Sequence, residues 1–309
     1  KLDSPRSIGM LRHFTQLMRT YTSGRYTVVH ANTSYHCGMA LLAAKCSGVR
    51  IRIAHARTDQ LRHRSLKNRI VAVLGKLLIA FCATDKLAIS GNSAAFLFGS
   101  MRDVAILPDA IETEKFCNPD SLRIARTIAK YQLNDKTIIG HVGRFDRAKN
   151  QEFLIRVFVK YCKSHTDSVL VLIGDGDLIK ECKKTVSELG IKDKVLFLGV
   201  RSDVDIWMNI FHVFVFPSIY EGLGNAAVEA QAAGIPCLCS DAVPRDVDME
   251  LGLVKYLSLN DEISTWCDAI EKMKNTPKAK PDQIMRAFQR RKYTISNAVE
   301  LLKTIYEGC

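Results

Sequence analysis

One stretch decides how this chain is organised: Pro217-Ser218-Ile219-Tyr220-Glu221-Gly222-Leu223-Gly224-Asn225-Ala226-Ala227-Val228-Glu229-Ala230. It joins a predicted buried strand over residues 213–216 to a short predicted helix. Gly222 and Gly224 let the backbone approach a ligand at the turn, and the first N–H groups of the helix form an anion site. Glu221 and Glu229, with seven residues between them, place two carboxylates beside that site.

Two carboxylates beside an anion site fit a ligand that carries both phosphates and hydroxyls. In a nucleotide-sugar, the diphosphate would accept hydrogen bonds from the amides, and the sugar and ribose hydroxyls would donate to the carboxylates. The alternative is that acidic residues favour the positive end of the helix dipole. Because that alternative does not explain the Glu-Gly-x-Gly loop before the helix, we favour the ligand.

The rest of the chain alternates short apolar strand candidates with helical patterns, which predicts a parallel α/β architecture. The strand candidates are 26–30, 50–55, 86–89, 104–107, 138–142, 168–173, 194–198, 213–216 and 237–239. The helical patterns are 7–21, 35–47, 65–81, 91–98, 121–131, 150–164, 177–189, 203–210 and 225–233, with a helical tail from about 261 that Pro277 and Pro281 interrupt.

Four segments together resemble retaining glycosyltransferases of family 4, in particular bacterial enzymes that build capsular polysaccharides and exopolysaccharides. They are 197–199 with 216–236, Gly143-Arg144-Phe145 with Lys149-Asn150, Ile173-Gly174-Asp175-Gly176, and Ile106-Leu107-Pro108-Asp109-Ala110-Ile111 with Phe116. The carboxylate motif and the Arg/Lys loop are specific in combination, whereas the Gly-Asp-Gly match alone is weak.

The resemblance implies the GT-B fold, which has two Rossmann-like parallel-sheet domains. We expect an acceptor-side domain over residues 1–112, a donor-binding domain over 113–290, and a C-terminal helix over 291–309 that packs back on the first domain. The hinge is expected near 108–118. The family also has a strand and a Gly-rich loop before the helix equivalent to 7–21, so the first domain is expected to be incomplete and less stable than the second.

The resemblance also assigns donor-side roles. Arg144 and Lys149 would hold the diphosphate, Arg as a bidentate fork and Lys as a point charge. Glu221 would contact the donor sugar, and Glu229 would accept hydrogen bonds from the ribose. The loop residues Gly222, Leu223, Gly224 and Asn225 would line the donor site. Fixed cations can stabilise a leaving diphosphate without a metal ion, so we expect no metal and no cofactor, and we interpret Asp175-Gly176-Asp177 as a turn before a helix.

The acceptor side is less defined by the sequence. The family places an active-site histidine in the region of His55, which we take as the catalytic candidate. Close relatives often show His-x-His where this chain has His55-x-Arg57, so the second position could be the usual one. His30 is another candidate near a strand end, and each of these residues could instead be structural.

The net charge of +12 is unevenly distributed. Residues 1–110 contain 16 Lys/Arg and 5 Asp/Glu, which suggests an anionic partner. The densest basic group precedes the apolar segment 70–83: Arg57, Arg62, Arg64, Lys67 and Arg69. Such a segment can rest on an anionic membrane, and it can equally be a solvated helix face before a core helix. No nucleic-acid-binding module is recognisable.

The remaining composition is that of a soluble two-domain protein. The 309 residues are 47% apolar, and the longest apolar run is too short for the roughly 20 residues that cross a bilayer. Ten cysteines without a Cys-x-x-Cys motif indicate reduced thiols and a cytoplasmic protein. The basic segment before 70–83 would allow peripheral association at the inner face of the membrane.

The sequence therefore predicts a metal-independent retaining hexosyltransferase that moves a sugar from a nucleoside diphosphate sugar to a growing polysaccharide or lipid-linked glycan. Two alternatives remain: a non-catalytic nucleotide-sugar-binding or assembly subunit, and a sugar-nucleotide epimerase of related fold. An NAD enzyme is disfavoured because no Gly-x-Gly-x-x-Gly follows a strand. The base, sugar, acceptor and oligomeric state are not encoded in the motifs.

Overall fold

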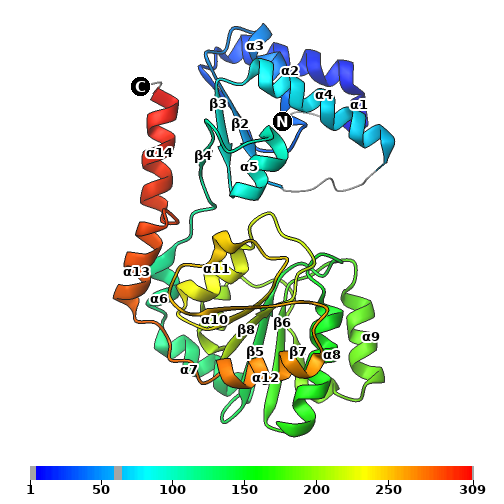
Figure 1. The fold of residues 1–309 in the computed structure, drawn as a ribbon, viewed down its shortest axis with the longest axis vertical. Helices are drawn as coiled ribbons and strands as arrows, with labels where there is room; N and C mark the ends of the chain where they lie inside the picture. The colour runs from blue at the N-terminus through cyan, green and yellow to red at the C-terminus, as the bar shows by residue number, and fades with distance from the viewer. Residues whose placement is uncertain (1–4, 59–64, 308–309) are drawn as a thin grey trace. The chain divides into compact units, whose positions relative to one another are not determined.

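The computed structural model describes residues 5–58 and 65–307, and its chain divides into two compact units (Figure 1). Unit 1 comprises residues 1–110 and 295–309, and unit 2 comprises residues 111–294. The chain thus leaves unit 1 once and returns to it for its last helix. Within unit 2, Ile111 forms an isolated parallel bridge with Thr294, so the two segments that connect the units are paired there.

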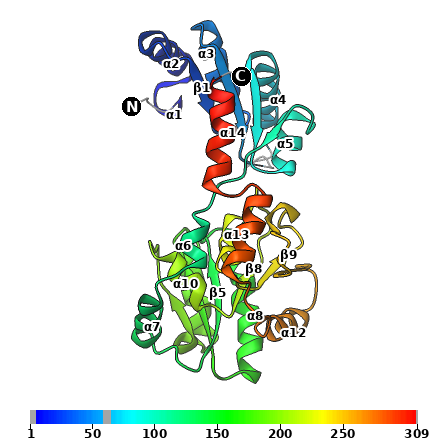
Figure 2. The same ribbon diagram turned by 90° about the vertical axis from the view of Figure 1, so that its left-hand side faces the viewer.

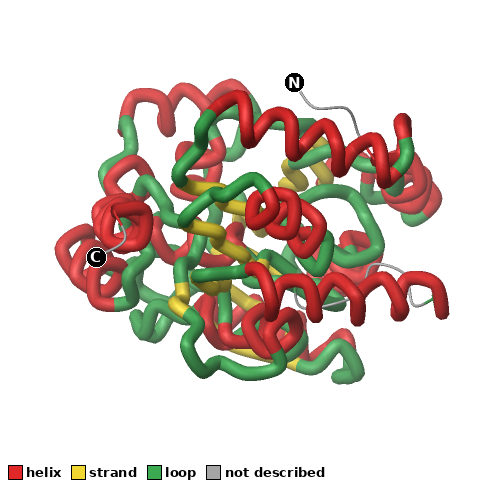
Figure 3. Tube along the Cα trace, turned by 90° about the horizontal axis from the view of Figure 1, so that it is seen from above, coloured by secondary structure: helices red, strands yellow, loops and turns green. Residues whose placement is uncertain are grey.

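Unit 1 has a parallel four-stranded sheet in the order β1-β2-β3-β4. Its strands are β1 (Val28–Ala31), β2 (Ile51–Ala56), β3 (Asp85–Ala88) and β4 (Ala105–Ile106). Its helices are α1 (Pro5–Ile8), α2 (Met10–Gly24), α3 (Cys37–Cys46), α4 (Leu66–Cys82), α5 (Gly91–Phe98) and α14 (Ile295–Glu307). Strands and helices alternate along this part of the chain. Figure 3 shows the helices of the described chain in red and the strands in yellow.

The unit 1 sheet is covered on both faces. On one face, Ala54, Ala56 and Ala88 pack with buried residues of α3, α4 and α5. On the other face, Ile51, Ile53 and Leu87 pack against apolar residues of α14, which Figure 2 shows beside this unit. Parallel strands buried on both faces are expected to be almost wholly apolar, and β2 has that pattern apart from Arg52 and His55.

Unit 2 has a parallel six-stranded sheet in the order β10-β9-β8-β5-β6-β7. Its strands are β5 (Thr137–Val142), β6 (Ser168–Ile173), β7 (Val195–Phe197), β8 (Val213–Phe216), β9 (Cys237–Ser240) and β10 (Val254–Leu257). Its helices are α6 (Thr113–Cys117), α7 (Ser121–Lys130), α8 (Gln151–Ser164), α9 (Ile179–Glu188), α10 (Val204–Ile210), α11 (Asn225–Ala232), α12 (Ile263–Met273) and α13 (Pro281–Arg290), with short 3-10 turns at Lys192–Lys194 and Arg245–Val247.

The strand order places the functional edge of unit 2. After β5 the chain adds β6 and β7 on one side, then returns and adds β8, β9 and β10 on the other. The neighbouring strands β5 and β8 are therefore followed by connections that run toward opposite edges of the sheet. Open α/β sheets bind ligands at such a switch point. The loops after β5 and after β8 are residues 143–150 and 217–224.

The core of unit 2 holds these strands rigidly. Residues of α8, α9 and α12, including Phe158 and Trp266, pack with Ile139, Leu170 and Val215 on one face of the sheet. On the other face Phe211 lies so close to Gly140 that a Cβ there would be 2.0 Å from the phenylalanine ring. The central strand β5 is thus fixed from both sides beneath the loop that it leads into.

The predicted α/β fold with two parallel sheets is confirmed, and the strands 168–173 and 213–216 are observed with the predicted limits. The sequence analysis missed β10 and α6. It also took Pro281 as a break, whereas Pro281 is the first residue of α13, where its missing N–H costs no helical hydrogen bond.

Gly174 provides a test of how tightly the loop after β5 is supported. Its φ is 134°, and an added Cβ would lie 2.0 Å from the carbonyl oxygen of Gly143. We expect Gly174→Ala to lower the free energy of unfolding of unit 2 by about 3 kcal/mol or more, since backbone must move. Gly190 is the control, because its φ is 67° but nothing lies within 4 Å; Gly190→Ala should cost about 1 kcal/mol.

Urea unfolding followed by tryptophan fluorescence measures this difference, because both tryptophans, Trp207 and Trp266, are buried in unit 2. Equal losses in the two variants would contradict the close contact between the backbones at Gly174 and Gly143.

Candidate functional site

The loop after β5 is shaped by hydrogen bonds to the end of β6. Gly143 donates its N–H to the carbonyl of Ile173 (2.9 Å), and Phe145 donates to the carbonyl of Asp175 (2.9 Å). A Cβ at Gly176 would lie 2.4 Å from the carbonyl oxygen of Phe145. The weak Gly-Asp-Gly motif is therefore explained as the support of this loop, and Asp175 itself is exposed.

Asp146 organises the second half of the same loop. Its Oδ1 accepts hydrogen bonds from the N–H groups of Ala148 (3.1 Å) and Lys149 (3.2 Å), and its Oδ2 accepts from Nε of Arg144 (2.8 Å). Sequence reasoning missed Asp146, although an aspartate that bonds to N–H groups two and three residues later is a common turn signal. The loop is thus fixed by its own side chain before any ligand binds.

The loop after β8 is attached directly to the loop after β5. Ile219 donates its N–H to the carbonyl of Ala148 (2.7 Å), and Asn150 donates from Nδ2 to the carbonyl of Pro217 (3.1 Å). Ser240, at the end of β9, donates to the carbonyl of Ser218 (2.5 Å). Two loops far apart in the sequence therefore form one surface at the switch point.

Lys149 and Glu221 meet on that surface. The Nζ atom of Lys149 donates to Oε1 of Glu221 at 2.6 Å, and only 20% and 11% of the two side chains are exposed. Nζ also lies 4.6 Å from the centre of the Phe216 ring. Loss of either partner would leave an unpaired charge in a largely buried position. The two predicted donor residues, Lys149 and Glu221, therefore stabilise each other.

Glu229, in the second turn of α11, lies in the same electrostatic environment. Burial raises the pKa of this carboxyl to about 7, and the nearby Lys149 and Lys115 partly offset that rise. Glu229 is therefore partly protonated at neutral pH and can both donate and accept hydrogen bonds. Lys115, on α6, had no signal in the sequence that linked it to this site.

The other predicted donor residues differ in how they are placed around Lys149 and Glu221. Leu223 is buried, Gly224 takes a φ of 107° at the start of α11, and Gly222 and Asn225 lie in the same turn. The Arg144 side chain is 69% exposed and bonds to Asp146, and no contact between it and Glu221 or Glu229 is observed in the described residues. The structure thus brings together Lys149, Glu221 and Glu229, and leaves Arg144 facing solvent on the same loop.

His141 and Gln151 lie beneath this loop and were not predicted. The Nδ1 of His141 lies 2.9 Å from the carbonyl oxygen of Val215, and Nε2 lies 3.3 Å from Nε2 of Gln151. Gln151 also donates to the carbonyl of Arg144 (2.9 Å). Because complete burial lowers the pKa of His141 to about 4, the ring is neutral and acts as a fixed hydrogen-bonding support.

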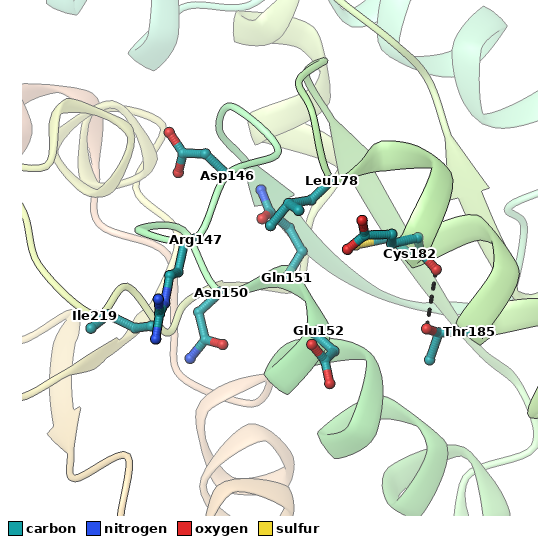
Figure 4. Close-up of a pocket in the computed structure, with 10 residues that line it drawn as sticks. Asp146, Arg147, Asn150, Gln151, Glu152, Leu178, Cys182, Thr185 and Ile219 are labelled. Carbon is teal, nitrogen blue, oxygen red and sulfur yellow. Dashed lines mark hydrogen bonds between the residues drawn. The ribbon is translucent and has the colours of Figure 1, made fainter.

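A separate pocket of about 190 Å³ lies on the outer side of the same loop (Figure 4). Arg147, Asn150, Gln151 and Ile219 contribute to its lining, together with side chains from α9. Lys149 and Glu221 do not line it. Its volume is below the roughly 300 Å³ at which ligand pockets begin, so we do not assign the donor to it.

Unit 1 has its own polar cluster at the carboxyl ends of β1 and β2. The two rings of His30 and His55 stack with centroids 5.2 Å apart, and Nε2 of His30 lies 3.2 Å from Nδ1 of His55. His30 Nδ1 lies 2.7 Å from the hydroxyl of Tyr306, on α14. Arg57 donates from one nitrogen to both carboxylate oxygens of Asp109, at 2.6 and 2.7 Å.

Burial lowers the pKa of His55 to about 4, with further contributions from His30 and Arg57. His55 is therefore neutral near pH 7. Its Nε2 atom is buried and has no hydrogen-bond partner among the described residues. Tyr306 and Asp109 were not assigned to this cluster from sequence. The return of the C-terminal helix to the first domain was expected, but its pattern did not show which of its residues would face His30.

The structure describes only part of the basic group that was predicted to contact a membrane. Arg57 is used in the pair with Asp109 and is not a free surface cation. Arg62 and Arg64 lie outside the described residues, the Lys67 side chain is not described, and Arg69 is exposed. No helix within 5–58 and 65–307 is long and apolar enough to cross a bilayer. In the same ranges, no cluster of three or more His, Cys, Asp or Glu side chains could hold a metal ion.

The raised pKa of Glu229 predicts how stability depends on pH. Between the model-peptide pKa of 4.5 and about 7, the folded chain keeps a proton on this carboxyl that the unfolded chain has lost. The stabilising contribution of Glu229 is therefore complete below pH 4.5 and is lost as the pH rises through 7. Relative to Glu229→Gln, the wild type should lose up to about 3 kcal/mol over this interval.

Urea unfolding of both proteins at several pH values measures this change. A difference between them that stays constant from pH 4.5 to 7.5 would show that the Glu229 carboxyl is ionised in the folded protein throughout.

Comparison with known proteins identifies the family of this chain. Residues 124–291 match the family described as glycosyl transferases group 1. EpsF of Bacillus subtilis is 34% identical over 293 residues, covering 92% of this chain and 75% of EpsF. The UDP-Gal:alpha-D-GlcNAc-diphosphoundecaprenol alpha-1,3-galactosyltransferase of Escherichia coli is 26% identical, covering 76% of this chain and 64% of that enzyme.

Among solved structures, Anabaena Alr3699/HepE in complex with UDP-glucose superposes with a TM-score of 0.77 at 19% identity, over 96% of this chain and 82% of that one. At this identity the similarity is evidence of the fold, and it confirms the predicted GT-B architecture. With the family match covering more than half of its residues, the chain belongs to the glycosyl transferases group 1 family.

Proposed function

We propose that this protein is a retaining glycosyltransferase that moves a hexose-type sugar from a nucleoside diphosphate sugar to a growing polysaccharide or lipid-linked glycan. The observation that carries the proposal is the pair of Lys149 and Glu221 at the switch point of the unit 2 sheet, 2.6 Å apart and beside Glu229. A fixed cation, two carboxyl groups and a helix N-terminus suit the phosphates and hydroxyls of one nucleotide-sugar.

In this proposal, Lys149 binds the donor diphosphate together with the first amides of α11. Glu221 then changes its partner from Lys149 to a hydroxyl of the donor sugar, and Glu229 bonds to the ribose hydroxyls. Arg144 supplies a second cation, since its exposed side chain shares the loop with Lys149. These fixed charges would stabilise the leaving diphosphate, so we propose a metal-independent reaction. The UDP-glucose complex of the Anabaena neighbour supports a donor of this class.

We assign the acceptor to the polar cluster of unit 1. The neutral His55 could accept a hydrogen bond from the acceptor hydroxyl only if its Nε2 atom, which is buried here, became accessible when the acceptor binds. A conjugate acid with a pKa of about 4 holds a proton weakly. His55 would therefore orient the hydroxyl, rather than carry its proton away from the site.

The acceptor class is proposed from the relatives and from the thiol content. The Escherichia coli relative acts, by its name, on a sugar attached to diphosphoundecaprenol. A lipid-linked acceptor of that type fits the cationic charge of unit 1. Ten cysteines without a disulfide framework suit a protein that works on the cytoplasmic side of the membrane.

Arg144→Ala tests the donor site with little risk to folding. Because the Arg144–Asp146 pair is exposed, its loss should change stability by less than about 1 kcal/mol. Binding of nucleoside diphosphates should nevertheless weaken by about 2–5 kcal/mol if Arg144 contacts the diphosphate. Calorimetric titration with UDP, GDP and ADP measures this change.

Arg147→Ala is the matched control, since Arg147 is an exposed arginine of the same loop that lines the outer pocket. Its nucleotide affinity should equal that of the wild type. Equal affinities in all three proteins would remove Arg144 from the donor site, and absence of binding in the wild type would end the proposal.

The stereochemical proposal has its own test. Incubation with a nucleotide-sugar that binds and with a lipid-diphosphate-linked sugar should give a product whose anomeric proton shows the same configuration as the donor by NMR. An inverted configuration would contradict the retaining mechanism. Donor binding without turnover for any acceptor would favour the binding-subunit alternative.

A further inference from the structure

Helix α4 has an inner face that is fully used for packing. Ala72, Gly75, Ile79 and Cys82 are buried and repeat at helical spacing against α3. A Cβ at Gly38 of α3 would lie 2.5 Å from the carbonyl oxygen of Gly75, so the two helices lie very close together. The core of unit 1 therefore accounts for this one face of α4.

The outer face of α4 is apolar as well, although it is exposed. Its large apolar residues are 54–73% exposed: Leu66, Ile70, Val73, Leu74, Leu77 and Phe81. The spacing of 4, 3, 1, 3 and 4 residues places them on one side of a single helix. A surface helix normally carries polar residues there. Exposed apolar residues that are continuous, rather than scattered, mark an interaction surface.

This apolar face continues into a groove between α4 and α5. The groove has a volume of about 270 Å³ and is lined by Val73, Leu77, Ala80, Leu97 and Phe98, with Lys76 and Lys86. A second hollow beside it adds Arg69 and Phe96. The apolar surface is therefore bordered by cations along its length.

A further cation stands at the far end of the helix. Lys45 places its Nζ 3.5 Å from the centre of the Phe81 ring and donates to the Phe81 carbonyl (2.9 Å). Helix α4 itself contains Lys and Arg but no Asp or Glu. Among the described residues that line the two hollows beside this stripe, the charged ones are all cations. An apolar stripe bordered by cations matches the interface of an anionic bilayer, where acyl chains lie beneath phosphate groups.

We propose that the outer face of α4 docks onto an anionic lipid bilayer, with the side chains of Ile70, Leu74 and Leu77 inserted and with Arg69 and Lys76 at the phosphate level. The biological purpose of the docking rests on the lipid-linked acceptor proposed above, whereas the surface itself is defined by residues of α4, its neighbour α5 and Lys45. Arg69 belongs to the basic group predicted from sequence, whereas Arg57 of that group is paired with Asp109.

A second copy of the chain is a poorer occupant of this face. A symmetric contact through α4 would bring Arg69 and Lys76 near their own copies, and the helix offers no carboxylate to pair with them. Like charges placed together across an interface oppose association. The lipid phosphates instead compensate the same cations.

The double variant Leu74→Ser/Leu77→Ser tests the docking in the full chain. Both side chains point to solvent, so folding should be retained, as circular dichroism can verify. The matched control is Leu122→Ser on α7 of unit 2, where the leucine is 67% exposed. Co-sedimentation is measured with vesicles of phosphatidylcholine alone and of phosphatidylcholine with phosphatidylglycerol.

Wild type and Leu122→Ser should bind the phosphatidylglycerol vesicles, less strongly at high salt, and should bind phosphatidylcholine weakly. The double variant should lose at least about tenfold in affinity, since burial of a leucine is worth more than 1.4 kcal/mol. Arg69→Gln should also weaken binding to the anionic vesicles while leaving phosphatidylcholine binding unchanged.

Failure of the wild type to bind anionic vesicles, or equal binding by the double variant, would overturn the proposal. So would a wild-type dimer that the double variant converts to a monomer, because the second copy would then be the occupant. Nucleotide binding measured on the same samples separates the two proposals: its absence counts against the donor site, and it has no bearing on docking.

Discussion

The parallel pairing of β5 with β8 is the constraint on which the rest of unit 2 depends. It places the ends of two strands side by side although 70 residues of chain separate them. Backbone bonds from Ile219 to Ala148 and from Asn150 to Pro217 then join the two loops. Only because these bonds fix both loops can Lys149 and Glu221 meet at 2.6 Å with little exposure, where a flexible pair would be hydrated and weak.

The charge of Lys149 acts on the two carboxyl groups of this surface, Glu221 and Glu229. Lys149 contacts Glu221 and the ring of Phe216, and it also acts on Glu229, which remains partly protonated because burial outweighs that attraction. On the proposed function, a diphosphate would compete with Glu221 for Lys149 and would release a carboxylate toward the sugar. The same cation would thus hold Glu221 in place before the donor binds and would then recognise the diphosphate of the donor.

The sequence predicted what depends on local pattern and missed what depends on packing. Strands β6 and β8 were placed correctly because each is an uninterrupted apolar run. Strand β10 was missed because Val254–Leu257 is an edge strand with Lys255 exposed, and so lacks that signal. The residues of the carboxylate motif were predicted from their spacing, and Asp146 had a turn signal that was overlooked. His141 and Gln151 support the loop after β5 through contacts that no motif encodes. The outward position of Arg144 could not be predicted, because it depends on the local bond to Asp146.

Helix α4 shows where hydrophobic pattern alone is ambiguous. Its residues are apolar on both faces, so periodicity could not decide between a core helix and an interfacial one. The structure separates the two roles: Gly75 and Ile79 are buried in the core, while more than half of Leu74 and of Leu77 is exposed. Folding therefore gives no reason for large apolar residues on the outer face. In a unit with 16 basic and 5 acidic residues among its first 110, the simplest physical reason is a surface that is both apolar and negatively charged at its border.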